Sequence, residues 1–146
     1  MEKQNIPLGM AVGKMMNVMF RVLKIRTGEQ TDAKLTIEQF GLLHAISIKE
    51  DEVIQKDMAE IMGKDKSSIL RLIDTLEKKE LVRRVVDNDD RRKNYLMVTK
   101  KGDKVIKQYL EIELKLMGEL QYGLTATDME TFYKVINHIR NNAEKI

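Results

Sequence analysis

Basic and hydroxyl-bearing side chains gather in the middle of this 146-residue chain, and their chemistry is the binding of anions. Between Lys64 and Lys101, twelve Lys or Arg residues stand against seven Asp or Glu residues. A helix is predicted over about 66–79, and free backbone N–H groups in its first turn favour a phosphate. Hydroxyls can hydrogen-bond phosphates or base edges, and an arginine one turn further along can reach a guanine edge. The candidates for contacting nucleic acid on this helix are Lys66, Ser67, Ser68 and Arg71.

A plainer structural interpretation of these residues is also open. Ser67 and Ser68 could simply begin a helix, and Arg71 could pair with Asp74 or Asp65. The basic charge could then be an ordinary solvated surface, with ion pairs that contribute little.

A second charged segment, 87–94, has three acids followed by three bases. An arginine at a loop tip loses side-chain entropy when it docks, and a carboxylate two positions earlier can hold it extended. An arginine aimed in this way suits the negative potential of a narrow minor groove. The alternative is a solvated polar turn. The candidates in this segment are Asp90, Arg91, Arg92 and Lys93.

Apolar periodicity predicts the elements that position these side chains. Capping residues mark their ends, with a capping box of Thr36 and Gln39, Gly63 as a C-cap and Asp65 as an N-cap. Helices are expected from Pro7 to about Ile25, from Thr36 onward, over about 55–62, over about 66–79, from Thr99 to Leu120, and after Thr125. A polar break is expected at 26–32, a short strand at 53–54, and two β-prone segments at 81–86 and 95–98.

This order predicts a mainly α fold with a small β-wing: a winged helix-turn-helix core flanked by N- and C-terminal dimerisation helices. The expected parts, within one structural unit, are an N-terminal dimerisation helix and linker at 1–34, the winged helix-turn-helix at 35–102, and C-terminal dimerisation helices at 103–146.

Composition excludes several other kinds of protein. The chain has no cysteine and only two histidines, which argues against thiolate or structural zinc sites. No paired carboxylates, nucleophile–base set or glycine-rich phosphate loop stands out, so neither an enzyme nor a cofactor is expected. No apolar run approaches the roughly 20 residues that span a bilayer. We therefore expect a cytoplasmic protein with no membrane partner.

The residues of the middle segment resemble the MarR family of transcriptional regulators. The matching motifs are Leu81-Val82-Arg83-Arg84, Asp87-x-x-Asp90-Arg91-Arg92 and Val98-Thr99-x-x-Gly102. The resemblance covers nearly the whole chain and implies a bacterial, homodimeric winged-helix protein that binds double-stranded DNA, usually a repressor released by a small ligand. It makes Arg92 the minor-groove arginine and Asp90 its brace. Glu80 departs from the family, which often has glycine there, and the absence of cysteine excludes the thiol-sensing branch.

The first and last predicted helices carry apolar stripes that a monomer would expose, so we expect a homodimer on a pseudo-palindromic operator. Met15 and Met19 of the first helix and His44 of the second are candidates for a pocket that takes a small apolar or aromatic acid effector. The alternative is that the methionines fill the core and the histidine is structural.

The leading hypothesis is thus a sequence-specific transcriptional regulator, with a repressor the expected kind. The alternative is a winged-helix module that coats DNA without sequence choice or binds protein. Arg71→Ala separates them, because a sequence reader should lose affinity for its own site far more than for random DNA.

Overall fold

The computed structural model describes residues 6–49, 52–90 and 94–146. Its elements in chain order are α1 (Leu8–Gln30), α2 (Ile37–Ile48), α3 (Gln55–Met62), α4 (Lys66–Lys78), β1 (Val82–Val86), β2 (Asn94–Val98), α5 (Lys100–Leu120) and α6 (Ala126–Ala143). The chain divides into two compact units, Met1–Glu113 and Leu114–Ile146, and α5 runs through the boundary.

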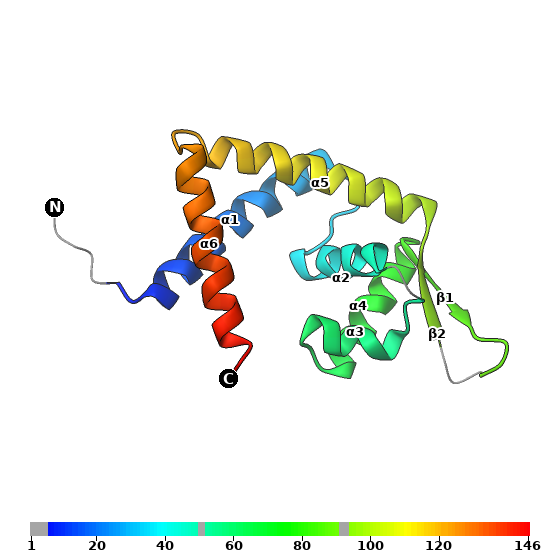
Figure 1. Ribbon diagram of the computed structural model, residues 1–146. Coiled ribbons are helices and arrows are strands. Elements are labelled where there is room, and N and C mark those ends of the chain that lie inside the picture. The colour runs from blue at the N-terminus through cyan, green and yellow to red at the C-terminus, as the bar shows by residue number, and fades with distance from the viewer. Residues whose placement is uncertain (1–5, 50–51, 91–93) are drawn as a thin grey trace. The chain divides into compact units, whose positions relative to one another are not determined.

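The first unit holds the hydrophobic core. Helices α2, α3 and α4 pack together with the two-stranded sheet beside them (Figure 1). The core residues come from each of these elements, from the segment before each of α2, α3 and β1, and from α5: Leu35, Leu42, Leu43, Ile46, Val53, Met58, Ile69, Ile73, Leu76, Leu81, Val82, Leu96, Val105, Ile106 and Tyr109. Burial of these side chains supplies the main drive for folding and fixes α4 beside the sheet.

Helix caps set the short helices of this unit, as the sequence predicts. Thr36 and Gln39 form a reciprocal capping box at the start of α2, with both hydrogen bonds 3.1 Å long. Helix α3 ends at Gly63, whose φ of 61° places it in the left-handed region that glycine adopts without cost. Asp65 follows as the N-cap of α4. The turn between α3 and α4 is therefore encoded locally.

The two strands form an antiparallel hairpin whose register runs from Val82 opposite Val98 to Val86 opposite Asn94. The short strand expected at 53–54 is present only as a bridge between Ile54 and Tyr95, supported by a 2.8 Å bond from the Leu96 N–H to the Val53 carbonyl. This bridge joins the segment before α3 to the wing.

Helix α1 continues beyond the point where the sequence predicts a break. The expected polar break at 26–32 is wrong for residues 26–30, which remain helical. Thr27 is buried, and its hydroxyl donates to the Leu23 carbonyl at 3.0 Å, so a polar residue is satisfied inside the helix. The helix ends where the Thr31 N–H bonds the Thr27 carbonyl.

The second unit consists of the end of α5 and α6. Thr125 and Asp128 form a capping box at the start of α6, and hydrogen bonding from Thr125 to the Asp128 carboxylate, from the backbone N–H first and the side chain second, lowers the pKa of Asp128. Several large apolar side chains of α6 are exposed, among them Phe132, Val135, Ile136 and Ile139. Within the described ranges, no helix combines the length and apolar character needed to cross a membrane.

Candidate nucleic-acid interface

The start of α4 is organised by its N-cap. Asp65 accepts the backbone N–H of Ser68 at 3.1 Å and the Ser68 hydroxyl at 2.5 Å. These two bonds, the hydroxyl bond first, lower the pKa of Asp65. Because its proton is committed to Asp65, the half-buried Ser68 hydroxyl has only acceptor capacity left for another partner.

Ser67 and Arg71 lie exposed on the outer face of α4, opposite the buried Ile69 and Ile73. Lys66 is also exposed, but it lies three residues before Ile69 and seven before Ile73, so it begins the helix on their side and faces α3. The Arg71 Nε donates to the Ser67 carbonyl at 3.3 Å, which holds the side chain along the helix surface. Asp74, which the alternative interpretation pairs with Arg71, is bonded to Arg84 instead. The structure thus brings two of the four predicted helix residues, Ser67 and Arg71, together on one open face.

Arg84 on β1 joins the wing to this helix. Its guanidinium donates to Asp74 at 2.6 Å and Glu77 at 2.9 Å on α4, and its Nε donates to Gln55 of α3 at 2.9 Å. Burial lowers the pKa of Arg84, but the bonds to Asp74 and Glu77 outweigh it, so the net pKa is raised. The wing, the helix and α3 are therefore held in a fixed relation.

The described part of the wing is ordered around Asp87. This carboxylate accepts the Asp89 N–H at 2.9 Å and the Tyr95 hydroxyl at 2.8 Å. The bond to Asp87, together with burial, raises the pKa of Tyr95 to about 12. Asp90 is half-buried. Arg91, Arg92 and Lys93 lie outside the described residues, so their predicted contacts with DNA, and the bracing of Arg92 by Asp90, stay predictions.

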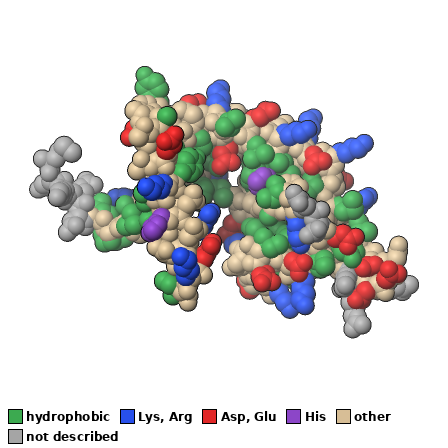
Figure 2. Space-filling model, viewed as in Figure 1, with side chains coloured by type: hydrophobic (Ala, Val, Ile, Leu, Met, Phe, Trp, Pro, Cys, Tyr) green, Lys and Arg blue, Asp and Glu red, His purple; other side chains and the backbone are tan. Residues whose placement is uncertain are grey.

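Acidic and basic side chains occupy different parts of the surface of the first unit. Figure 2 shows acidic side chains gathered at the described end of the wing, where Asp87, Asp89 and Asp90 lie, and basic ones elsewhere over the same unit.

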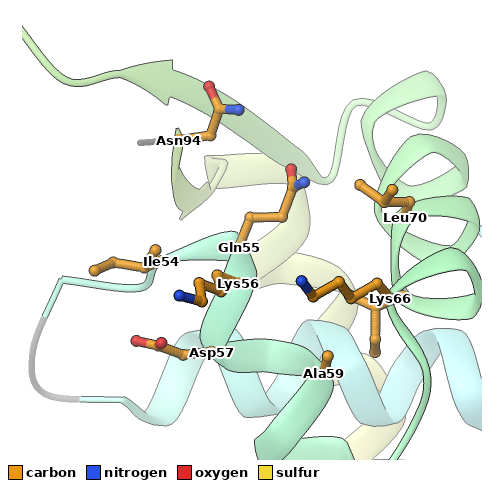
Figure 3. A pocket seen from close by; sticks show the side chains of 9 residues that line it. Ile54, Gln55, Lys56, Asp57, Ala59, Lys66, Leu70 and Asn94 are labelled. Atoms are coloured by element: carbon orange, nitrogen blue, oxygen red, sulfur yellow. The ribbon is translucent and has the colours of Figure 1, made fainter. Parts of the chain in front are cut away.

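A hollow of about 470 Å³ lies between α3, the start of α4 and the first residue of β2. It is lined by Ile54, Gln55, Lys56, Asp57, Ala59, Lys66, Ile69, Leu70 and Asn94. Figure 3 shows Lys66 reaching from α4 toward α3, with Asn94 above the same space. The hollow combines apolar walls with two ammonium groups.

The base of the wing is tied to the end of α4. The Thr99 hydroxyl donates to the Glu80 carbonyl at 2.6 Å and accepts the Gly102 N–H at 3.0 Å, and the Thr99 N–H donates to the Leu81 carbonyl at 3.1 Å. A Cβ on Gly102 would overlap the Leu81 carbonyl and approach Cγ1 of Val98 to 2.7 Å. This close approach explains a glycine three residues after Thr99.

Glu80, two residues after the end of α4, has a left-handed backbone conformation although it is not a glycine. Glu80 has a φ of 60°, its N–H bonds the Glu77 carbonyl, and the Leu81 N–H bonds the Leu76 carbonyl. This is the pattern in which glycine is favoured, and a side chain there costs roughly 1–2 kcal/mol. The expected departure at Glu80 therefore changes the energy of the helix end and leaves its geometry intact.

Met15 is exposed and Met19 half-buried on α1, and the half-buried His44 stacks on Phe40 of α2 with ring centroids 5.9 Å apart. A second cavity, of about 490 Å³, lies between the end of α2, the sheet and the start of α5. Neither cavity is lined by Met15, Met19 or His44. The predicted effector pocket among these three residues thus stays a prediction.

Sequence reasoning missed Arg84 and Tyr95 as residues that order this surface. Strand alternation was the available signal, since Arg83 and Arg84 must face opposite sides and only one of them can point toward the helices. Among the described residues, no three His, Cys, Asp or Glu side chains lie together in a way that could hold a metal ion.

Comparison with known proteins places this geometry among winged-helix proteins. The model of the MarR family matches residues 33–93, which include α2, α3, α4 and β1. Wild-type MarR from E. coli in its apo form is 22% identical, over 93% of this chain and 98% of that one, with a TM-score of 0.76.

Two further solved structures have a partner bound. MepR of S. aureus in a complex with DNA is 19% identical, over 94% of this chain and 99% of that one, with a TM-score of 0.82. CouR from Rhodococcus jostii RHA1 bound to p-coumaroyl-CoA is 18% identical, over 95% of both chains, with a TM-score of 0.75. At these identities the likeness establishes the fold, and the predicted winged helix-turn-helix with a small β-wing is confirmed.

Proposed function

Because this chain is a member of the MarR family of winged helix-turn-helix proteins, we propose that it is a transcriptional regulator that binds double-stranded DNA in a sequence-specific way. The observation that carries the proposal is the open outer face of α4, where Ser67 and Arg71 lie together, with Lys66 exposed at the start of the helix and a wing beside it that Arg84 joins to α4. A helix placed like this fits a major groove, with its N-terminus toward the phosphates.

The roles of the individual residues follow from their reach. Arg71 reads a base edge, Lys66 and Ser67 contact phosphates, and Ser68 accepts a hydrogen bond while its own hydroxyl stays hydrogen-bonded to Asp65, the N-cap of the helix. On the wing, Arg92 enters the minor groove with Asp90 as its brace, and Arg91 and Lys93 contact the backbone. MepR, a protein with this fold, was solved in complex with DNA, which supports DNA binding by this chain.

We propose that the protein works as a homodimer on a pseudo-palindromic operator, as a repressor in the bacterial cytoplasm. Exposed apolar side chains support this on α1, where Leu8, Met10 and Val18 lie open, and independently on α6. Pairing such surfaces removes them from water, and a two-fold axis then places two reading helices about 34–36 Å apart, one turn of DNA.

The proposed effector is a small apolar or aromatic acid. CouR, another relative with this fold, was solved with p-coumaroyl-CoA bound, which supports ligand control. One proposed place is the predicted pocket at Met15, Met19 and His44. The hollow lined by Lys56 and Lys66 is a second, because its apolar walls and two ammonium groups suit an organic anion, while its one carboxylate, Asp57, pairs with Lys49 at 3.4 Å. Occupation of the hollow would engage Lys66, which is also a proposed phosphate contact.

Selection of bound fragments from random duplex DNA tests the function. Enrichment of one inverted repeat, bound by a species that light scattering shows to be a dimer, is the expected result. Binding without any enrichment would instead support a DNA-coating module. Failure to bind duplex DNA at low ionic strength would overturn both, because phosphate contacts are strongest there.

A further inference from the structure

The linker between α1 and α2 contains a backbone conformation that its sequence does not favour. Lys34 has a φ of 48°, in the left-handed region that non-glycine residues rarely adopt. Such residues persist only where the surrounding structure holds them. The two neighbours of Lys34 are held in this way, each by a side chain from a different helix.

The first hold comes from α5. The Leu35 N–H donates to the Tyr109 hydroxyl at 2.8 Å, and the Tyr109 and Thr31 hydroxyls lie 3.4 Å apart. Tyr109 is 5% exposed, and its ring stacks on Phe40 with centroids 4.9 Å apart. The buried hydroxyl therefore anchors the linker to α5 from a rigidly packed ring.

The second hold comes from the residue that ends the reading helix. The Lys79 ammonium donates to the Ala33 carbonyl at 3.0 Å. The Lys79 carbonyl in turn accepts the Lys101 ammonium, from α5, at 3.1 Å. The end of α4 is thus connected to the linker on one side and to the start of α5 on the other.

From this arrangement we infer that Lys79 and Tyr109 are positioning residues: by fixing the carbonyl before Lys34 and the N–H after it, they set where α4 stands relative to α1 and the first part of α5. The inference rests on the proposed function for its consequence, which is that these two bonds help determine the half-site spacing that a dimer accepts. Neither side chain lies on the outer face of α4, so they act through position and not through DNA contact.

Two variants remove one bond each and keep the packing. Lys79→Met keeps the aliphatic stem, and Tyr109→Phe keeps the ring stack. Lys79→Arg can still donate to the Ala33 carbonyl and should restore the wild-type behaviour. Lys107→Met and Tyr122→Phe are matched controls, because Lys107 and Tyr122 are exposed and the changes remove the same groups.

The first measurement does not depend on DNA. The chain has no cysteine, so spin labels can be placed cleanly at Lys78→Cys on α4 and Glu111→Cys on α5, with excess unlabelled protein to isolate distances within one chain. We expect a broader distance distribution in Lys79→Met and Tyr109→Phe than in wild type, Lys79→Arg or the controls. Unchanged distributions in both variants would overturn the positioning role, whatever the DNA results.

The second measurement uses the inverted repeat that wild type enriches, with one base pair added or removed between the half-sites. We expect the ratio of affinities for the best and altered spacings to fall about threefold or more in the two variants, as loss of one hydrogen bond allows, and the affinity for a single half-site to stay unchanged. If the variants and wild type showed the same ratio of affinities for the best and altered spacings, the proposed effect on half-site spacing would be overturned. Wild type that enriches no repeat would defeat the proposed function, while the spin-label result would still decide the positioning role.

Discussion

The guanidinium of Arg84, on β1, lies 2.6 Å from the carboxylate of Asp74, on α4. A second bond from the same guanidinium reaches Glu77 at 2.9 Å, one turn further along the helix. The Arg84 side chain is 22% exposed, so water competes weakly at its end of the pair. One side chain thus joins the wing to the reading helix, in addition to the ties at the base of the hairpin.

Replacement of Arg84 tests this relation. Arg84→Met should lower the free energy of unfolding by about 1–2 kcal/mol, because the hydrogen bonds to both carboxylates are lost. It should also weaken DNA binding, since the wing and helix no longer approach in a fixed relation. The control is Arg83→Met, which removes the same charge from an exposed neighbour. Chemical denaturation measures the free energy of unfolding, and titration with DNA measures the affinity. Equal losses of stability and affinity in Arg84→Met and Arg83→Met would contradict a special role for the bonds from Arg84 to α4.

Replacement of Arg71 tests the reading of bases. Arg71→Ala should cost about 1–3 kcal/mol of affinity for the enriched repeat and much less for random DNA, because a base-edge contact carries discrimination. Lys78→Ala, a charge change on the last turn of the same helix, serves as the control. Fluorescence anisotropy on the two DNAs measures the difference. An equal loss of affinity for the enriched repeat and for random DNA would support a module that coats DNA without sequence choice.

Gly102 is expected to tolerate no side chain. Gly102→Ala should destabilise the fold by about 1–3 kcal/mol, because the new Cβ meets the Leu81 carbonyl and neither backbone can yield freely. Gly118→Ala is the control on the same helix, where nothing lies within 4 Å of the added atom. That change should stabilise by up to about 1 kcal/mol through helix propensity. Thermal unfolding of the two variants should therefore shift in opposite directions.

Glu80 offers a stabilising change. Glu80→Gly should be about 1 kcal/mol more stable than Glu80→Ala, since glycine adopts a positive φ without the steric cost of a Cβ. Both variants lose the exposed 3.7 Å ion pair with Lys101, so it cancels in the comparison. Equal unfolding midpoints for the two variants would show that the left-handed turn carries no penalty.

The Tyr95–Asp87 bond predicts a dependence on alkaline pH. The folded pKa of Tyr95, about 12, lies above its ordinary value of 10.0. The stability from this bond is therefore fully present below pH 10 and is lost as the pH rises through about 12. Accordingly, the destabilisation caused by Tyr95→Phe should shrink over this window. If the difference in unfolding free energy between wild type and Tyr95→Phe stayed constant up to pH 12, the hydrogen bond between Tyr95 and Asp87 would not contribute to stability.

The parts of the fold that the sequence predicted best depend on contacts within a few residues. The capping box of Thr36 and Gln39, the cap at Asp65 and the glycine turn at Gly63 each involve side chains and backbone in one turn of chain. Their physical cause is visible in the residue types alone. The same holds for the buried stripe of α4 and for the exposed Ser67 and Arg71 opposite it, whereas Lys66 begins the helix on the side of the stripe.

Features that depend on distant contacts could not be predicted in this way. The partners of Arg84 come from α3 and α4, and nothing local selects it over Arg83. Helix α1 extends past Ile25 because Thr27 is buried and internally bonded, which a polar sequence does not reveal. The left-handed Lys34 is likewise held by side chains 46 and 74 positions from the backbone groups they bind.

The ties at the foot of the hairpin have a practical outcome for protein engineering. Thr99 and Gly102 fasten the two strand ends to the Glu80–Leu81 turn, and the register between Val82 and Val98 begins from that anchorage. A substitution at either residue would therefore disturb the strand pairing from its base. Engineering of the wing should leave Thr99 and Gly102 unchanged.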